Sequence, residues 1–505
     1  MMTFETVAIW IFVVTLCATA LIVFPFRRLA MRIGMVDHPD SFRKLQKMPV
    51  SVGGGAVIFL VMIALITTLV LCREQVEFTL GLSPKLLLPI LVVSPFVVMV
   101  GLFDDIRGLN GKVKLLLQII AASVVVGFAK DYSLITCFGR DLDLNHLFYP
   151  LAVFWIIGMI NAINLLDGGD GVAATVGFFM SLATACIAYL NEHMGISLVA
   201  LGLAGCLSGF FLHNRPRAKV YLGDAGSMFI GLMLATLLLR ACVEPGRTIS
   251  ISGPLAIALI PLADALFAVM RRVNAKRTIF ATDRGHIHHL LSLKMSSPYR
   301  VLLVLMLLVL PGCIAAVAGT YYRNDLIPVA VSCAVLGVAL VTDLFGRREL
   351  FTAFGRIKAR LRKSFHPKKY MRKNGEAYHL QGNGPWKSLW NELMTVLRDK
   401  PCRYLKLDIS IPFKNEEFFG EWENIGRKSF PVLPTLDCRI PFLIEGRRVG
   451  TLRITFEMEI GSLHRNQGVL LEAATLCEKH LVKFLGSPAG SSSHTLPYLV
   501  RRKVA

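Results

Sequence analysis

The sequence has few charged residues, and acidic residues are the scarcer kind. Charged side chains make up 18% of the 505 residues, with 34 Asp and Glu against 55 Lys and Arg. Apolar residues make up 54%, and the mean hydropathy is +0.57. Soluble domains seldom reach this apolar content, so the composition argues against a wholly soluble protein.

Paired cysteines and a cleavable leader are also missing. The 11 cysteines are scattered and form no CxxC pair, so the sequence offers no disulfide framework and no cysteine-based zinc site. The first apolar run lacks the basic n-region and the small-residue cleavage site of a signal peptide. We therefore interpret this run as the first membrane span.

The formal net charge is +21, but its distribution argues against a nucleic-acid partner. Lys and Arg lie mostly in short loops between apolar runs and in one tract after the last run. In a membrane protein, such a distribution first of all sets the topology. We expect no nucleic acid among the partners of this chain.

Long apolar runs dominate the first two thirds of the chain. Each is long enough to cross a hydrocarbon core of about 30 Å. We predict an all-α polytopic membrane protein with about 10–11 transmembrane helices, in the windows 4–26, 50–72, 84–103, 113–129, 147–165, 171–190, 195–213, 220–240, 251–270, 301–319 and 325–346.

Positive charge alternates between the predicted loops. The first, third, seventh and ninth loops carry Lys and Arg, whereas the even-numbered loops have few or balance them with acids. The positive-inside rule then places the N-terminus outside, and the odd-numbered loops and the C-terminal part in the cytoplasm.

The composition changes after the predicted transmembrane domain, residues 1–346. Residues 347–384 form a basic juxtamembrane segment, typical of an amphipathic helix on the anionic inner leaflet or of a flank that fixes orientation. Residues 385–486 contain alternating stretches and a closing helical pattern, which predict a small soluble α+β domain of unknown role. Residues 487–505 are typical of a flexible tail.

Unusual polar residues lie at the predicted cytoplasmic ends of the spans. The stretch "GLFDDIRGLNGKVKLLLQ" places Asp104 and Asp105 at the end of the third span and Lys114 at the start of the fourth. Adjacent carboxylates at a membrane edge repel each other unless a divalent cation, a lysine or a proton compensates them. The alternative is a solvated loop with two acids of no special role.

The stretch "NAINLLDGGDG" connects the fifth and sixth spans. Asn164, Asp167 and Asp170 are spaced by three, so they share one helical face if the turn continues into the sixth span. The glycines allow a bulky ligand to approach the backbone. The alternative is a tight turn with a helix-capping Asp, which explains one Asp but not two Asp and two Asn.

Two further motifs complete the set. In "VYLGDAGSMFIG", Asp224 begins the eighth span, where a helix cap and a metal or phosphate contact are both open. Tyr221 is either an interfacial aromatic or a platform that stacks on a base. Asp264 lies inside the ninth span, and we expect it to form a structural pair with a neighbouring cation.

The stretch "DRGHIHHLL" is rich in donors for anions. Adjacent histidines make an awkward zinc chelate and no Cys lies near, so we favour anion binding over zinc or a solvated polar loop. The residues concerned are Arg284, His286, His288 and His289.

Together these motifs indicate phosphate chemistry at one face of a membrane. Carboxylate and amide oxygens favour Mg²⁺ over softer metals, and Mg²⁺ with Arg, Lys and His is suited to phosphate groups. The main alternative is a polytopic transporter of an anionic solute, although transporter sites lie near the midplane and we find no internal repeat. A third is a scaffold whose C-terminal domain recruits partners, against which the intact set of acids argues.

In this order, "FDD", "NAINLLDGGDG", "LGDAGS" and "GHIHH" resemble the motifs of the polyprenyl-phosphate N-acetylhexosamine-1-phosphate transferases, the family that includes the MraY and WecA proteins. The resemblance covers about residues 25–345, and "GHIHH" is closer to the WecA branch. It implies Mg²⁺-dependent transfer, with Mn²⁺ as a substitute, of N-acetylglucosamine-1-phosphate or a related sugar phosphate. The donor would be a UDP-sugar, the acceptor undecaprenyl phosphate, and UMP the other product. This reaction would initiate lipid-linked cell-envelope glycan synthesis.

The resemblance also implies a cellular location and partners. It places the chain in the bilayer of the bacterial cytoplasmic membrane, with the active site and the C-terminal domain in the cytoplasm, and it is compatible with a homodimer.

Residue roles follow by motif position. Asp104 and Asp105 match an acidic pair implicated in activating the lipid phosphate, and Lys114 matches a lysine that contacts phosphate. Asn164 and Asp224 match metal-binding positions. Whether the acceptor attacks directly or an aspartyl intermediate forms is left open.

The remaining motif residues match positions around the donor. Asp167 and Asp170 match the second acidic pair, with a contact to uracil as the alternative for Asp170, and Tyr221 matches an aromatic that packs on the base. The element that holds pyrophosphate and sugar is matched by Arg284, His286, His288 and His289. Gly169 stands where the family usually has leucine, and the first inner loop near Gln46 lacks a usual histidine. Both departures bear on the fit of the substrate.

Overall fold

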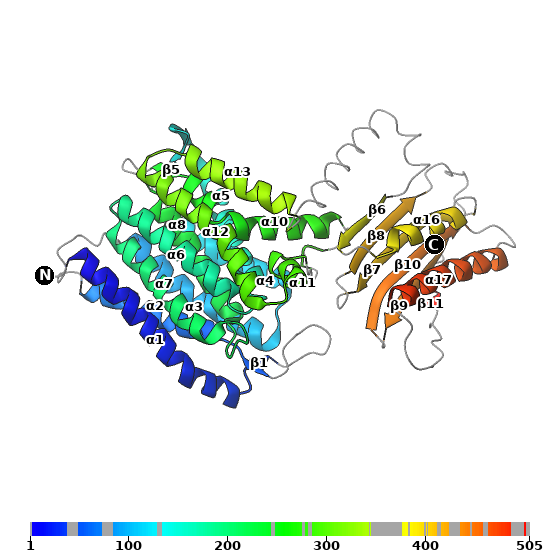
Figure 1. Cartoon of the computed structure of the whole chain (residues 1–505), viewed down its shortest axis with the longest axis horizontal. Coiled ribbons are helices and arrows are strands. Elements are labelled where there is room, and N and C mark those ends of the chain that lie inside the picture. Colours follow the sequence, from blue (N-terminus) through cyan, green and yellow to red (C-terminus); the bar gives the residue numbers. More distant parts are fainter. Residues whose placement is uncertain are drawn as a thin grey trace. The chain divides into compact units, whose positions relative to one another are not determined.

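The structure is a computed structural model, and its chain divides into two compact units (Figure 1). The first comprises Met1–Pro39, Leu45–Val269 and Phe280–Gly346, and the second comprises Asp40–Lys44, Met270–Ile279 and Arg347–Ala505. The structure describes residues 3–37, 49–72, 84–128, 134–243, 248–274, 278–280, 285–342, 344, 376–381, 384–397, 400, 402–411, 416–423, 435–444, 447–457, 463–485 and 499–500. Arg284, the first-loop residues near Gln46 and most of the basic juxtamembrane segment lie outside these ranges.

The first unit is built from helices, as the apolar windows predict. Each window coincides with a helix, and the ninth window contains two. The helices are α1 (Phe4–Arg32), α2 (Gly54–Leu71), α3 (Pro84–Arg107), α4 (Gly111–Gly127), α5 (Phe148–Leu166), α6 (Val172–Leu190), α7 (Met194–Asn214), α8 (Gly223–Ala241), α9 (Ser252–Ile257), α10 (Leu259–Asn274), α11 (Ile287–Lys294), α12 (Pro298–Tyr321) and α13 (Leu326–Val341).

Within the described residues, eight helices are long and apolar enough to cross a membrane, namely α1, α2, α3, α5, α6, α7, α8 and α12. Helices α4 and α13 are shorter, with 17 and 16 residues, and the ninth window is divided between α9 and α10. The protein is therefore a polytopic membrane protein, as predicted.

Helix α8 lies at the centre of the bundle and is buried along almost its whole length. Two glycines allow its N-terminal turn to be approached by backbone from both sides. A Cβ added at Gly55 of α2 would lie 1.9 Å from Gly226 Cα, and one added at Gly101 of α3 would lie 2.3 Å from Ala225 Cα. Atoms cannot come this close, so both positions require glycine.

Short strands support the two ends of the bundle. Strands β1 (Val36–Asp37) and β2 (Val50–Ser51) pair with each other, and Ser51 also bridges to Val220 just before α8. Strands β3 (Leu134–Cys137), β4 (Arg140–Asp143) and β5 (Thr248–Ser250) form a second small sheet, and a 3-10 turn, η2 (Asn145–Leu147), precedes α5.

The second unit is a six-stranded sheet with two helices. The strand order is β11-β9-β10-β7-β8-β6 and all neighbouring pairs are antiparallel. The elements are β6 (Glu376–Gln381), α16 (Trp386–Leu397), β7 (Cys402–Ile411), β8 (Glu416–Glu423), β9 (Thr435–Ile444), β10 (Arg447–Glu457), α17 (Leu463–Leu485) and β11 (Leu499–Val500). The predicted strand "YLKLDISI", the hairpin around residues 445–446 and the closing helix are all present.

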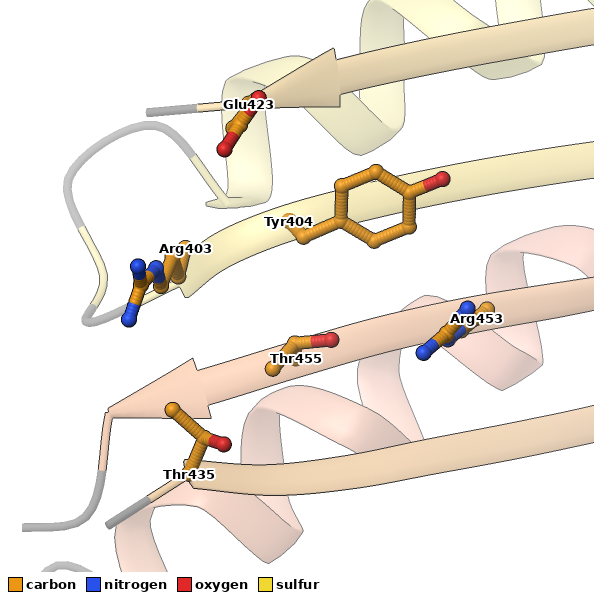
Figure 2. A pocket seen from close by; sticks show the side chains of 6 residues that line it. All are labelled: Arg403, Tyr404, Glu423, Thr435, Arg453 and Thr455. Atoms are coloured by element: carbon orange, nitrogen blue, oxygen red, sulfur yellow. The ribbon is translucent and has the colours of Figure 1, made fainter. Parts of the chain in front are cut away.

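One face of this sheet forms the core of the second unit. Alternate side chains of the strands, among them Leu407 and Ile454, pack with side chains of α16 and α17, among them Trp386. At one end of the other face, side chains of four neighbouring strands line a hollow of about 310 Å³ (Figure 2). They are Arg403, Tyr404, Glu423, Thr435, Arg453 and Thr455.

An ion pair and a hydrogen bond connect neighbouring strands on this open face. Arg453 Nε donates a hydrogen bond of 2.8 Å to Asp437 Oδ1, and the Tyr404 hydroxyl donates one of 2.7 Å to Glu421. Burial opposes the ionisation of Asp437, but the hydrogen bond and charge of Arg453 outweigh it and keep the pKa of this carboxyl below its usual value.

Candidate active site

The Asp pair at the end of α3 and the lysine of α4 come together across a tight turn. Gly108, with φ of 70°, turns the chain, and Asn110 caps α4 through its side chain. Asp104 Oδ1 accepts a hydrogen bond of 2.6 Å from the Leu109 backbone, and Asp104 Oδ2 lies 2.7 Å from Lys114 Nζ. The same turn that joins the two helices therefore forms the first ion pair of the site.

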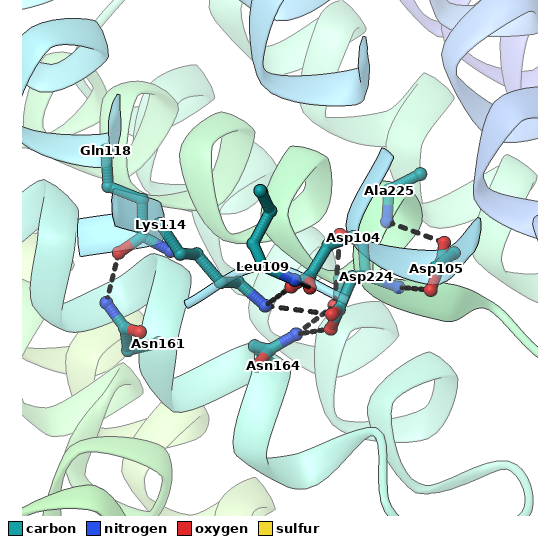
Figure 3. Close-up of polar contacts among 10 residues, drawn as sticks. Asp104, Asp105, Leu109, Lys114, Gln118, Asn161, Asn164, Asp224 and Ala225 are labelled. Atoms are coloured by element: carbon teal, nitrogen blue, oxygen red, sulfur yellow. Dashed lines mark hydrogen bonds and ion pairs between the residues drawn. The ribbon is translucent and has the colours of Figure 1, made fainter. Parts of the chain in front are cut away.

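Asp224, at the start of α8, joins this pair to α5 (Figure 3). Its Oδ2 lies 2.9 Å from Lys114 Nζ. Its Oδ1 accepts a hydrogen bond from Asn164 Nδ2, which also donates one of 2.8 Å to the hydroxyl of Ser227. Four helices thus contribute Asp104, Lys114, Asn164 and Asp224 to one polar cluster.

Asp105 faces away from Lys114 and caps the start of α8. Its Oδ1 accepts a hydrogen bond of 2.8 Å from the Asp224 backbone, and its Oδ2 accepts one of 3.3 Å from the Ala225 backbone. The first N–H groups of a helix have no partner within the helix, so a carboxylate there satisfies them and interacts favourably with the helix dipole. Gly223 makes room for it, because an added Cβ would lie 2.6 Å from Asp105 Oδ2.

Asp167 and Asp170 diverge, so the predicted common helical face is wrong. Asp167 caps the end of α5, whereas Asp170 lies in a turn before α6 begins at Val172. Asp170 Oδ2 accepts hydrogen bonds of 2.9 and 3.1 Å from the backbones of Arg217 and Ala218. The helical path ends with α5 at Leu166, and Gly171, with φ of 73°, starts the next helix after Asp170.

Burial and neighbouring carboxylates disfavour the charged form of Asp167. Burial, and then the nearby carboxylates of Asp224 and Asp105, raise the pKa of Asp167 well above its usual value. Tyr221 lies in the same region, and its backbone N–H donates a hydrogen bond of 2.8 Å to Ser51 O. Burial, followed by the charges of Asp170, Asp37 and Asp167, raises the pKa of Tyr221 to about 12.

The histidine motif is fixed by Asp264, which lies in α10. Asp264 Oδ2 is 3.1 Å from His286 Nδ1, and Asp264 Oδ1 accepts a hydrogen bond of 3.0 Å from the Ile287 backbone at the start of α11. Asp264 therefore binds the histidine loop, and its expected pairing with a cation stays a prediction. The rings of His286 and His288 are parallel, with centroids 6.1 Å apart, and the rings of His288 and His289 are 4.1 Å apart.

His288 joins the histidine loop to the "DGGDG" turn. A Cβ added at Gly168 would lie 2.7 Å from His288 Nε2, so the imidazole packs directly on the turn. His288 is buried, and within the described residues neither ring nitrogen has a hydrogen-bond partner. Burial, then the neighbouring His289 and His286, lower the pKa of His288 well below its usual value.

Known proteins resemble the chain over these helices. A family profile described as glycosyl transferase family 4 matches residues 87–242. A probable undecaprenyl-phosphate N-acetylglucosaminyl 1-phosphate transferase of Bacillus subtilis is 32% identical over 298 residues, which cover 58% of this chain and 80% of the relative. The chain belongs to the polyprenyl-phosphate N-acetylhexosamine-1-phosphate transferase family.

Further relatives lie in both branches of the family. A decaprenyl-phosphate N-acetylglucosaminephosphotransferase of Mycobacterium tuberculosis is 31% identical over 345 residues, 63% of this chain and 84% of the relative. A phospho-N-acetylmuramoyl-pentapeptide-transferase of Streptococcus pneumoniae is 33% identical over 222 residues, 42% of this chain and 66% of the relative. The protein is therefore a membrane transferase, which decides against the transporter and the inactive scaffold.

The structure adds two residues of the transferase that the motifs did not single out. Asn161 Nδ2 donates hydrogen bonds of 2.8 Å to Gln118 Oε1 and to Ile157 O, one helical turn from the cluster (Figure 3). Gln118 follows Lys114 by four residues and Asn161 precedes Asn164 by three. Helical spacing alone could therefore have placed both beside the site.

The cluster offers oxygen ligands of the kind that Mg²⁺ prefers. Mg²⁺ usually binds one or two carboxylates and fills its other positions with water and substrate phosphates. Asp104 and Asp224 offer two such carboxylates, and no group of three or more His, Cys, Asp or Glu suited to a metal occurs in the described ranges. Asn164 Nδ2 donates a hydrogen bond to Asp224 Oδ1, which places its amide beside this carboxylate, and its role as a metal ligand stays a prediction.

Proposed function

We propose that the protein transfers N-acetylglucosamine-1-phosphate, or a related N-acetylhexosamine-1-phosphate, from a UDP-sugar to undecaprenyl phosphate. The acceptor and the sugar are those in the names of the B. subtilis and M. tuberculosis relatives, which act on undecaprenyl or decaprenyl phosphate. The observation that carries the proposal is the convergence of Asp104, Lys114, Asn164 and Asp224 from four helices. The products would be UMP and a lipid-linked sugar for cell-envelope glycan synthesis, made at the cytoplasmic membrane.

The reaction exchanges one phosphorus–oxygen bond for another. An oxygen of the acceptor phosphate attacks the β-phosphorus of the UDP-sugar. The bond from this phosphorus to the bridging oxygen breaks, and UMP leaves with the electron pair. A phosphate monoester has its second pKa near 6 and is largely ionised at neutral pH. Positioning and charge stabilisation therefore matter more than a strong base.

Asp224 and Asp104 would hold Mg²⁺, or Mn²⁺ in its place, and the metal would neutralise charge on the phosphates. Lys114 adds a positive charge from α4. Asp105 binds no reacting atom in this scheme, because both its oxygens hold the start of α8 and so fix the position of Asp224.

The histidine loop, residues 285–289, would bind the UDP-sugar. His288 has two ring nitrogens without a partner in the described part of the chain, and it lies on the turn that follows Asp167. A buried nitrogen without a partner is costly, and a pyrophosphate or sugar oxygen would satisfy it once the loop adjusts. Asp264 orients the loop from behind through His286 and the Ile287 backbone.

The test uses purified protein, undecaprenyl phosphate and Mg²⁺ with a panel of UDP-sugars. UMP and the lipid product are measured together, and Asp224→Ala is compared with Lys112→Met, an exposed position of the same site region. We expect stoichiometric UMP and lipid-linked product with one or more UDP-N-acetylhexosamines, and no Mg²⁺-dependent UMP from Asp224→Ala. UMP release without a lipid product, or near-normal turnover of Asp224→Ala, would contradict the proposal.

A further inference from the structure

Lys114 lies where a cation between Asp104 and Asp224 would lie. Its Nζ is 2.7 Å from Asp104 Oδ2 and 2.9 Å from Asp224 Oδ2. The three side chains are mostly buried, with exposed fractions of 15%, 11% and 29% for Lys114, Asp104 and Asp224. We infer that Lys114 and the divalent cation exchange at this position. Lys114 neutralises the carboxylates without metal, and metal binding releases it toward the substrate phosphates. This inference rests on the proposed function.

The carboxylates are built for such an exchange. Each is anchored through one oxygen: Asp104 Oδ1 by the Leu109 backbone at 2.6 Å, and Asp224 Oδ1 by Asn164. The other oxygen of each, Oδ2, faces Lys114. These hydrogen bonds hold Asp104 on the turn between α3 and α4, and Asp224 on α5, whichever cation lies between the Oδ2 atoms.

Mg²⁺ and the Lys114 ammonium would compete for these oxygens. Mg²⁺ binds carboxylate oxygen at about 2.1 Å, so an ion on Asp224 Oδ2 would lie at most about 5 Å from Lys114 Nζ as placed here. Two like-charged groups at this distance repel strongly in a mostly buried site. Lysine is a compact charge on a flexible four-carbon stem, so its head can leave while its backbone stays in α4.

The exchange has a consequence that a simple phosphate-binding lysine does not have. The side chains of Asp104 and Asp224 also hydrogen-bond to each other (Figure 3), and loss of the Lys114 charge would leave this pair of acids without a cation. The metal would then bind more tightly even without any substrate, and the metal-free protein would be less stable. A lysine that contacts only substrate phosphate would leave metal affinity in the absence of substrate unchanged.

The experiment measures Mn²⁺ binding to the full-length purified protein without substrates, through the electron paramagnetic resonance signal of free Mn²⁺. Lys114→Met keeps the length of the side chain and removes its charge. The matched control is Lys112→Met, which removes an exposed charge two residues away on the same helix. We expect at least tenfold tighter binding for Lys114→Met and a change below twofold for Lys112→Met. Equal or weaker binding by Lys114→Met overturns the exchange, and so does an absence of binding by both this variant and the wild type.

A second variant covers the case in which Lys114→Met fails to fold. Lys114→Arg keeps the charge and the competition, so it should bind Mn²⁺ no more tightly than the wild type, and tighter binding overturns the inference. Thermal unfolding gives a second readout: Mg²⁺ should raise the unfolding temperature of Lys114→Met more than that of the wild type. If the wild type releases UMP normally and Lys114→Met has the Mn²⁺ affinity of the wild type, only the exchange is contradicted. If the wild type makes no lipid product, the proposed function is lost.

Discussion

Replacement of Asp105 by asparagine tests whether this residue caps α8 or takes part in the reaction. Asn has one acceptor oxygen, so it cannot place a separate oxygen on each of the Asp224 and Ala225 backbones as Asp105 does. Loss of one hydrogen bond to a charged group costs about 1.5–3 kcal/mol. Loss of a negative charge at a helix N-terminus adds about 0.3–1 kcal/mol. We therefore expect the variant to be destabilised by about 2–4 kcal/mol.

The assay combines thermal unfolding with turnover. For domains of 150–250 residues, 1 kcal/mol corresponds to about 2–4 °C, so the unfolding temperature of Asp105→Asn should fall by about 4–16 °C. Turnover should fall by about 10²-fold, because a small displacement of Asp224 misplaces the groups that it holds. Asp104→Asn provides the comparison, since Asp104 faces Lys114 and does not cap α8.

The unfolding temperature and the turnover of Asp105→Asn together distinguish the two roles. An unchanged unfolding temperature together with a loss of turnover by three or more orders of magnitude would show that Asp105 acts in the reaction. The capping role, and with it the different assignment of the two neighbouring acids, would then be wrong.

Three further predictions concern the histidine loop. Gly168→Ala should destabilise the protein by about 1–3 kcal/mol and weaken donor binding, because its Cβ would lie 2.7 Å from His288 Nε2. Gly169→Ala, whose Cβ would meet a Val172 methyl at 3.0 Å, should cost less than half as much in the same unfolding assay, and an equal cost would refute this geometry. Asp264→Ala should raise KM for the UDP-sugar at least tenfold with little change in KM for the lipid, and equal changes in both would contradict a role in the loop. The pKa of His288 is lowered in the folded state, so its contribution to stability is present above the unfolded pKa of about 6.5 and is lost as pH falls below it. Unfolding of the substrate-free protein should therefore become easier below about pH 6.5, and His288→Asn should flatten this dependence.

The helical fold could be read from the sequence because its signal is long and local. Every apolar window coincides with a helix, since a run of about twenty apolar residues has few other stable conformations. The lengths of the helices were less predictable. The ninth window breaks between α9 and α10 at Ala258, and nothing in its apolar pattern marks the break. In the second unit, alternation predicted β7, but not that β6 pairs with β8 at the sheet edge.

The members of the site were predictable, but their partners were not. Motif spacing brought Asp104, Lys114 and Asp224 to one membrane face, and the structure joins them through a single ammonium group. Helical spacing failed for Asp167 and Asp170, because α5 ends at Leu166 and Asp170 lies in the turn before α6, where it accepts hydrogen bonds from the backbones of Arg217 and Ala218. Contacts of this kind depend on backbone turns between helices, on which periodicity carries no information.

The start of α8 explains why residues so far apart in the chain form one site. Asp224 must lie close to α3, α4 and α5 at once, which is possible only where backbones approach without side chains between them. Gly55 and Gly101 provide this approach from α2 and α3, and Gly223 admits the carboxylate of Asp105. A side chain at any of these three positions would push α8 away from the cluster. A larger residue at any of the three should therefore reduce turnover by displacing Asp224, even though none of them carries a functional group.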